Sequence, residues 1–322
     1  HKAYIDSLEK IPYKWRFPIL GAKVRKLGFA LPLPNGIMVN YVVGTQYINI
    51  DNLAVGLTND PSTFKNVDKV ARFEEIKPFV NVLNIRYDVW LLPFLDIYAL
   101  GGYVHSVTDV KLALPIQAEF TSIGNGPMVG WGFVLAGGFG PLFAEIDFNM
   151  VWTFMPQLFE PSLAKVFDIR VGHLFNFPRR PWSNFSIIVG AEWLKINPSS
   201  YGSADLSQLF GGGSGGDNSG KQEDLDDWYS ELPEHKQDAF NELYEAFQSG
   251  LSGESGDKYI YYTFDKKLYY PWSMTVGVNY QINDRFILDA FYTFLGSRNQ
   301  LVIGFNYRFG FKGKNLMEGV TL

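Results

Sequence analysis

The stretch at residues 301–311, LVIGFNYRFGF, alternates between two kinds of side chain. The odd positions are apolar or aromatic, and the even positions are mostly polar or glycine. The odd set is Leu301, Ile303, Phe305, Tyr307, Phe309 and Phe311, and the even set is Val302, Gly304, Asn306, Arg308 and Gly310. Because successive side chains of a strand point to opposite faces, the stretch is predicted to be a β-strand with one apolar face.

Nine further runs repeat this alternation, at residues 37–46, 79–90, 95–107, 128–139, 142–154, 167–177, 185–194, 272–281 and 286–294. Each has roughly the 9–11 residues that cross a membrane as a tilted strand. The polar faces hold Gly, Asn, Asp, Glu and Arg, and the apolar faces end in aromatic residues, which suit membrane interfaces. An open sheet edge would leave backbone groups unpaired in lipid, so the sheet must close. We therefore predict an all-β chain, a transmembrane antiparallel up-and-down β-barrel of about ten strands. A soluble sandwich or lipocalin-like barrel is the alternative.

Composition narrows the classes of protein further. The 322 residues are 47% hydrophobic, 16% aromatic and 19% charged, with no cysteine and a mean hydropathy of -0.04. No stretch approaches the roughly 18 apolar residues of a membrane helix. Without cysteine there are no disulfides and no Cys-ligated metals. The formal charge of -5 argues against a nucleic-acid partner, which would favour a basic excess.

A resemblance supports the same architecture. Residues 301–311 resemble the closing strand of Gram-negative outer-membrane β-barrels, and residues 90–98, WLLPFLDIY, are similar to a segment of poorly characterised barrels of that class. The resemblance covers residues 37–311 and implies a location in the bacterial outer membrane, but no activity. Such barrels usually end on the aromatic residue, whereas residues 312–322 follow here. Either they form a short periplasmic tail, or the strand at residues 301–311 is not the last ordered element.

Loop lengths predict the orientation of the barrel. Tight turns are expected near Pro93, Pro141 and Asp284, and longer connections at residues 58–70, 109–127, 155–163 and 198–266. Short turns face the periplasm in such barrels. The predicted division is a leader at residues 1–34, a barrel at residues 35–311 that includes the external connection 198–266, and the tail.

The connection 198–266 is predicted to carry an acidic helical hairpin. Apolar residues recur at helical spacing in 223–232, and a second helix is expected from Pro233 to about Ser249. Residues 217–257 hold twelve acidic residues against Lys221 and Lys236. The hairpin either covers its own barrel or binds a basic protein partner. The candidate partner-binding residues are Asp224, Asp226, Asp227, Trp228, Tyr229, Glu242 and Glu245. Calcium binding fits poorly, because the order of an EF-hand loop is missing.

Charged residues on the polar phase are predicted to line the lumen. They are Arg86, Asp88, Asp96, Glu145, Asp147, Asp168, Arg170, Glu192, Asp289 and Arg308. Buried charges must be paired or hydrated, so a ladder of ion pairs filling a narrow barrel is one interpretation. Carboxylates attract cations, so a cation-preferring passage is the other.

The leader at residues 1–34 carries a net charge of +5. A basic segment beside an acidic lumen could enter it, which makes Lys23, Arg25 and Lys26 candidate plug residues. A leader lying on the periplasmic surface is the alternative.

The sequence predicts no catalytic, metal or cofactor site. His105 and His173 fall on apolar phases, and no histidine clearly accompanies Asp147 and Asp168. The predicted function is a narrow or plugged passage for small solutes, or else a non-conducting scaffold that binds a partner through the hairpin. Outer-membrane lipid and lipopolysaccharide are the expected surroundings.

Overall fold

The computed structural model describes residues 12–56, 58–66, 72–114, 118–205, 237–238, 241 and 259–317. Within these residues, ten strands form one closed antiparallel barrel, which confirms the predicted architecture and strand number. The first and last barrel strands close it, in a register that runs from Asn35↔Phe309 to Gln46↔Arg298. The ten strands are β1 (Asn35–Gln46), β4 (Arg72–Leu92), β5 (Leu95–Leu114), β6 (Ala118–Phe139), β7 (Leu142–Thr153), β8 (Ser162–Phe177), β9 (Arg180–Ile196), β12 (Trp272–Gln281), β13 (Phe286–Phe294) and β14 (Arg298–Phe309).

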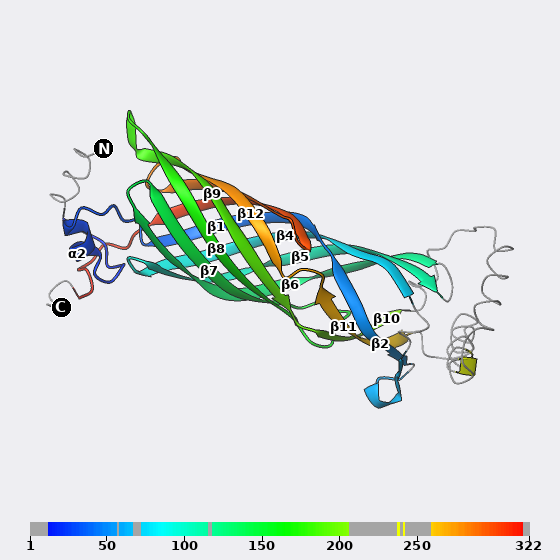
Figure 1. Ribbon diagram of the computed structural model, residues 1–322. Helices are drawn as coiled ribbons and strands as arrows, with labels where there is room; N and C mark the ends of the chain where they lie inside the picture. Colours follow the sequence, from blue (N-terminus) through cyan, green and yellow to red (C-terminus); the bar gives the residue numbers. More distant parts are fainter. Residues whose placement is uncertain are drawn as a thin grey trace.

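One end of the barrel carries the short turns, at residues 92–95, 139–142, 177–180 and 281–286. Gly140 in the second turn has a φ of 61°, a backbone conformation that glycine adopts without steric cost. The short helix α2 (Gly21–Lys26) lies at this end, which we call the short-turn end (Figure 1).

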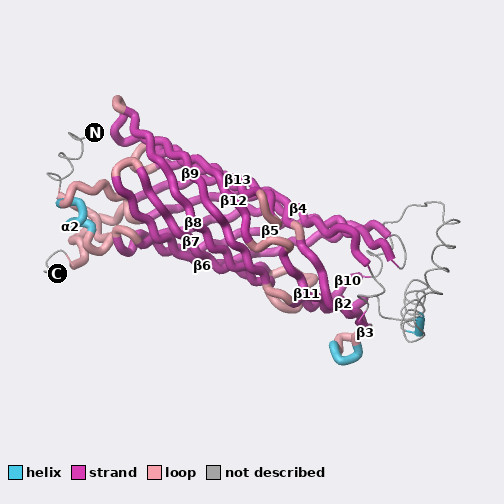
Figure 2. The backbone as a smooth tube through the Cα atoms, in the orientation of Figure 1, coloured by secondary structure: helices cyan, strands magenta, loops and turns pink. Residues whose placement is uncertain are grey.

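The opposite end is more regular than the sequence indicates. β4, β5 and β6 stay paired far beyond the neighbouring strands, so most of the predicted loop 109–127 is strand (Figure 2). The predicted loops 58–70 and 198–266 contribute to a second sheet with the order β10-β11-β2-β3. Its strands are β10 (Ser199–Asp205), β11 (Tyr259–Leu268), β2 (Ile48–Gly56) and β3 (Lys65–Asn66), with the 3-10 helix η1 (Pro61–Thr63) before β3. The predicted helical hairpin lies outside the described residues, apart from residues 237, 238 and 241.

The second sheet has an aromatic cluster of its own. The rings of Phe159 and Tyr201 lie 4.7 Å apart, and Phe64 lies 6.0 Å from Tyr201. Lys266 donates a hydrogen bond to the Ser162 hydroxyl, and burial lowers the pKa of its amino group. These contacts join the second sheet to the start of β8.

The two faces of the barrel wall carry different kinds of side chain, as β12 illustrates. Trp272, Met274 and Val276 are exposed on the exterior, whereas Ser273 and Thr275 between them are buried in the interior. The other barrel strands repeat this arrangement, with apolar side chains such as Ile85, Ile169 and Ile303 outside. The predicted distribution, with apolar side chains on the exterior and polar side chains in the interior, is therefore present in the structure.

Large interior side chains lie over glycines of neighbouring strands. A Cβ atom on Gly132 would lie 2.5 Å from the Tyr98 ring, and one on Gly172 would lie 2.3 Å from the Phe143 ring. The small residues of the polar phase therefore make room for bulky neighbours, and these bulky side chains narrow the barrel.

Candidate functional site: the charged interior

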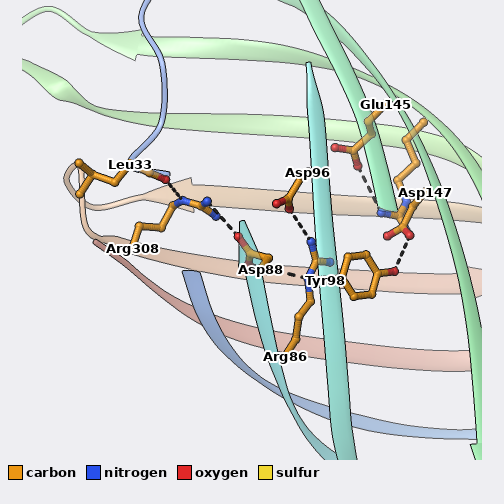
Figure 3. Close-up of polar contacts among 9 residues, drawn as sticks. Leu33, Arg86, Asp88, Asp96, Tyr98, Glu145, Asp147 and Arg308 are labelled. Carbon is orange, nitrogen blue, oxygen red and sulfur yellow. Dashed lines mark hydrogen bonds and ion pairs between the residues drawn. The ribbon is translucent and has the colours of Figure 1, made fainter. Parts of the chain in front are cut away.

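A chain of ion pairs begins at the short-turn end. The Arg308 guanidinium donates to Asp88 at 3.0 Å and to the carbonyl of Leu33 at 2.9 Å (Figure 3). Arg86 lies 3.8 Å from the other oxygen of Asp88 and donates to Asp96 at 2.9 Å. Alternating positive and negative groups are thus in contact across β14, β4 and β5, with β1 lying between β14 and β4.

The chain continues into the middle of the barrel through an aromatic ring. The guanidinium of Arg86 lies 3.7 Å from the centre of the Tyr98 ring, a cation–π contact. The Tyr98 hydroxyl donates to Asp147 at 2.6 Å (Figure 3). On the adjacent strand, Arg170 contacts Glu145 and Asp168, both at 3.2 Å. Asp147 and Asp168 are paired across β7 and β8, so two carboxylates face each other there.

Toward the opposite end, Arg298 donates to Glu192 at 2.8 Å. On the wall between β12 and β13, the Asn279 amide donates to Asp289. Charged groups consequently extend along the length of the barrel rather than forming a single cluster.

The interior contacts have an acidic excess. They bring together seven carboxylates and four guanidinium groups, with Asp88 fully buried and Asp96 and Asp168 each 2% exposed. Among the described residues, oxygens of these three aspartates and the Nε atoms of Arg86 and Arg170 are buried without a hydrogen bond to another protein atom. Buried charged atoms without a partner are costly. The interior is therefore polar, and its acidic side chains outnumber its basic ones.

The exterior gives the environment of the molecule. No helix in the described part of the chain is long and apolar enough to cross a membrane. The barrel exterior carries apolar side chains around a polar interior, and closure leaves no unpaired edge in the part of the barrel where all ten strands are paired. This is the organisation of barrels that span the outer membrane. The chain is an outer-membrane β-barrel.

Comparisons with solved structures return matches of low identity and low TM-score. The barrel is similar to the β domain of the Bordetella autotransporter BrkA, with 10% identity over 86% of this chain and 100% of that chain, at a TM-score of 0.35. The transport unit of the autotransporter AIDA-I from Escherichia coli shows 8% identity over 86% of this chain and 90% of that chain, at a TM-score of 0.37. An outer membrane channel from Pseudomonas putida F1 shows 8% identity over 86% of this chain and 96% of that chain, at a TM-score of 0.31. No family model and no curated protein sequence matches the chain.

All ten residues predicted to line the lumen lie on the interior of the outer-membrane barrel. They are Arg86, Asp88, Asp96, Glu145, Asp147, Asp168, Arg170, Glu192, Asp289 and Arg308. Arg298, which pairs with Glu192, was not among the residues predicted to line the lumen. Its signal was present, because Arg298 has the same even phase as Arg308, but the predicted strand began three residues too late at Leu301.

The other predicted sites lie elsewhere. All seven candidate partner-binding residues, in 224–229 and at Glu242 and Glu245, lie outside the described residues. The candidate plug residues Lys23, Arg25 and Lys26 lie on α2, at the mouth of the barrel (Figure 1). The interior carboxylates instead contact arginines of the barrel strands, as described above.

Two chain segments form a cap at the short-turn end, which we define as residues 12–34 and 310–317. Trp15 and Lys312 form a β-bridge. The side-chain amide of Asn315 donates to the carbonyls of Trp15 at 3.2 Å, Arg16 at 3.3 Å and Pro18 at 2.9 Å. Within the cap, burial raises the pKa of the Tyr13 hydroxyl, which donates to Phe17. The described parts of the predicted leader and tail therefore meet as one structured unit.

Replacing Asn315 by leucine is expected to detach the first segment of the cap. The change removes hydrogen bonds worth about 1 kcal/mol each from the Asn315 side chain to the carbonyls of Trp15, Arg16 and Pro18. We expect trypsin to cleave after Lys23, Arg25 or Lys26 at least tenfold faster, with the barrel intact. The exposed neighbour Lys314 provides the control, because Lys314→Gln should leave the cleavage rate unchanged. Equal rates in both variants would contradict this role of Asn315.

The histidines do not join the carboxylates of the interior. His105 contacts Asn125 on the exterior, and His173 is exposed beside Phe175. The described residues contain no group of three or more acidic or histidine side chains arranged to hold a metal ion.

Proposed function

We propose that the outer-membrane barrel is a non-enzymatic, narrow passage that prefers small cations. The observation that carries this proposal is the polar interior, in which seven carboxylates outnumber four guanidinium groups. Carboxylates lining a pore attract cations. Wide aqueous channels need about 16 strands, so a barrel of ten strands is restricted to small solutes.

Ion selectivity in planar lipid bilayers tests the passage. Under a KCl gradient, the reversal potential of the full chain should indicate a preference for K⁺ over Cl⁻. Arg298→Gln removes a positive charge from the interior and should raise that preference several-fold, whereas Glu192→Gln should lower it. The matched control is Lys195→Gln, which makes the same change of charge at an exposed position of the odd, exterior phase of β9. The proposal would be contradicted if the Arg298 and Glu192 variants kept the K⁺ over Cl⁻ preference of the unchanged chain, or if Lys195→Gln changed that preference by the same amount.

A non-conducting scaffold is the second candidate. It is supported by the second sheet, in which β10 and β11 hold both ends of the long acidic connection side by side at the end opposite α2. The barrel would then remain silent in bilayers and retain a basic protein partner that is lost on deletion of residues 223–249. The proposed surroundings in either case are outer-membrane lipid and lipopolysaccharide.

A further inference from the structure

The cap is strongly basic. Residues 12–34 carry five basic side chains and residues 310–317 carry two, and neither segment has an acidic residue. The cap also exposes large apolar side chains, with Leu27 72% exposed, Phe311 60% and Phe29 52%. Basic and apolar groups on one surface match the chemistry of a lipid interface, where a headgroup charge lies beside hydrocarbon.

A cavity of about 320 Å³ lies between the cap and the barrel wall. From the cap it is lined by Arg16, Phe17 and Leu316, and from the barrel by Tyr87 and Val89 of β4. Tyr87 and Val89 belong to the exterior phase of β4, and Tyr87 is 43% exposed. The cavity therefore combines lipid-facing apolar walls with an exposed guanidinium group.

Aromatic side chains indicate the level of this cavity relative to the membrane. A row of rings follows the exterior of β13 and β14 at the short-turn end, with centroids 5.4 Å apart for Phe286 and Tyr307, 5.9 Å for Tyr307 and Phe309, and 5.5 Å for Phe309 and Phe311. Phe311 itself lines the cavity. Aromatic girdles mark the membrane–water interface of such barrels. The cavity thus lies at the headgroup level of the leaflet nearest the short turns.

We propose that the cavity and the cap bind an anionic glycerophospholipid of the inner leaflet of the outer membrane. Its phosphate contacts Arg16 with support from Lys14 and Lys312, and the start of an acyl chain lies along Tyr87 and Val89. The seven positive charges select an anionic headgroup over a zwitterionic one. The bound lipid fills the gap between the cap and the wall and holds the cap against the membrane.

Retention of defined lipids by the purified full chain tests this proposal. The barrel is incubated in detergent with phosphatidylglycerol or phosphatidylethanolamine, and bound lipid is counted by native mass spectrometry. We expect at least tenfold tighter binding of phosphatidylglycerol. Each basic residue near an anionic lipid surface is worth about fivefold in affinity. Arg16→Gln should therefore lower phosphatidylglycerol affinity about fivefold, and the triple variant with Lys14→Gln and Lys312→Gln about a hundredfold.

A second variant separates the cavity from the charge. Val89→Phe keeps all seven basic residues but fills the cavity, and it should also lose phosphatidylglycerol, with folding verified by heat-modifiable migration. Lys195→Gln, at the far end of the barrel, is the control and should bind normally. Equal binding of the two lipids, or full binding by the Arg16 and Val89 variants, would overturn the proposal. Displacement of the lipid by millimolar inorganic phosphate would do the same, because the site would then bind free anions.

Discussion

Replacing Arg86 by methionine is expected to lower the free energy of unfolding of the barrel by about 3–5 kcal/mol. Arg86 is the only guanidinium that contacts both Asp88 and Asp96 among the described residues, at 3.8 Å and 2.9 Å, and it lies on the ring of Tyr98. Methionine fills similar space but leaves Asp96 as a buried carboxylate without a positive partner. Urea unfolding of the barrel in detergent micelles, followed by tryptophan fluorescence, measures the loss.

Two further variants separate the effect of charge from the loss of packing. Adding Asp96→Asn to Arg86→Met removes the unpaired charge and should recover about half of the lost stability. Arg285→Met changes an exposed arginine at a short turn and should shift stability by less than about 0.5 kcal/mol. If Arg86→Met were as mild as Arg285→Met, the ion pairs would contribute little to the fold.

Replacing Gly132 by valine is expected to prevent formation of the native barrel. A Cβ atom at this position would lie 2.4 Å from the carbonyl oxygen of Phe148 on β7 and 2.5 Å from the Tyr98 ring. The backbone oxygen cannot move without breaking the pairing of β6 with β7, and Tyr98 is held by Asp147 and Arg86. The fraction of folded protein after refolding into lipid vesicles should fall at least tenfold.

The same strand offers a matched control. Gly137 of β6 lies on the exterior, and a Cβ atom there would meet nothing within 4 Å. Gly137→Val should therefore fold at the normal yield, and its added methyl groups face lipid. If both variants folded equally well, close packing in the interior would not be what requires glycine at position 132.

Much of the barrel is predictable because its walls face two different environments. In β14 and β12, lipid on one side and a polar lumen on the other impose a period of two residues that is visible without any structure. The interior position of Asp88, Arg170 and Arg308 follows from the same phase. Which acid contacts which arginine does not follow, because those contacts depend on the register between strands.

The parts outside the membrane are less predictable for a physical reason. β2 and β10 belong to the second sheet and not to the closed barrel, so they need no uniform lipid-facing side. Accordingly, INIDNLAVG at residues 48–56 and SSYGSAD at residues 199–205 show no clear alternation. They are strands because β11 pairs with both of them. Arg298 was missed at a similar boundary, where β14 leaves the region in which lipid dictates the pattern.

The pairing of β1 with β14 is the seam of the barrel, and it spans the largest separation in sequence of any two neighbouring barrel strands. On that side of β1, all twelve register partners of residues 35–46 are supplied by residues 298–309, near the other end of the chain. Loop-closure entropy therefore opposes this pairing more than any hairpin turn. The cap joins the same two ends of the chain through Trp15 and Lys312, just beyond the seam. An early meeting of the cap segments would raise the effective concentration of β1 and β14 for each other and would thereby favour closure of the barrel.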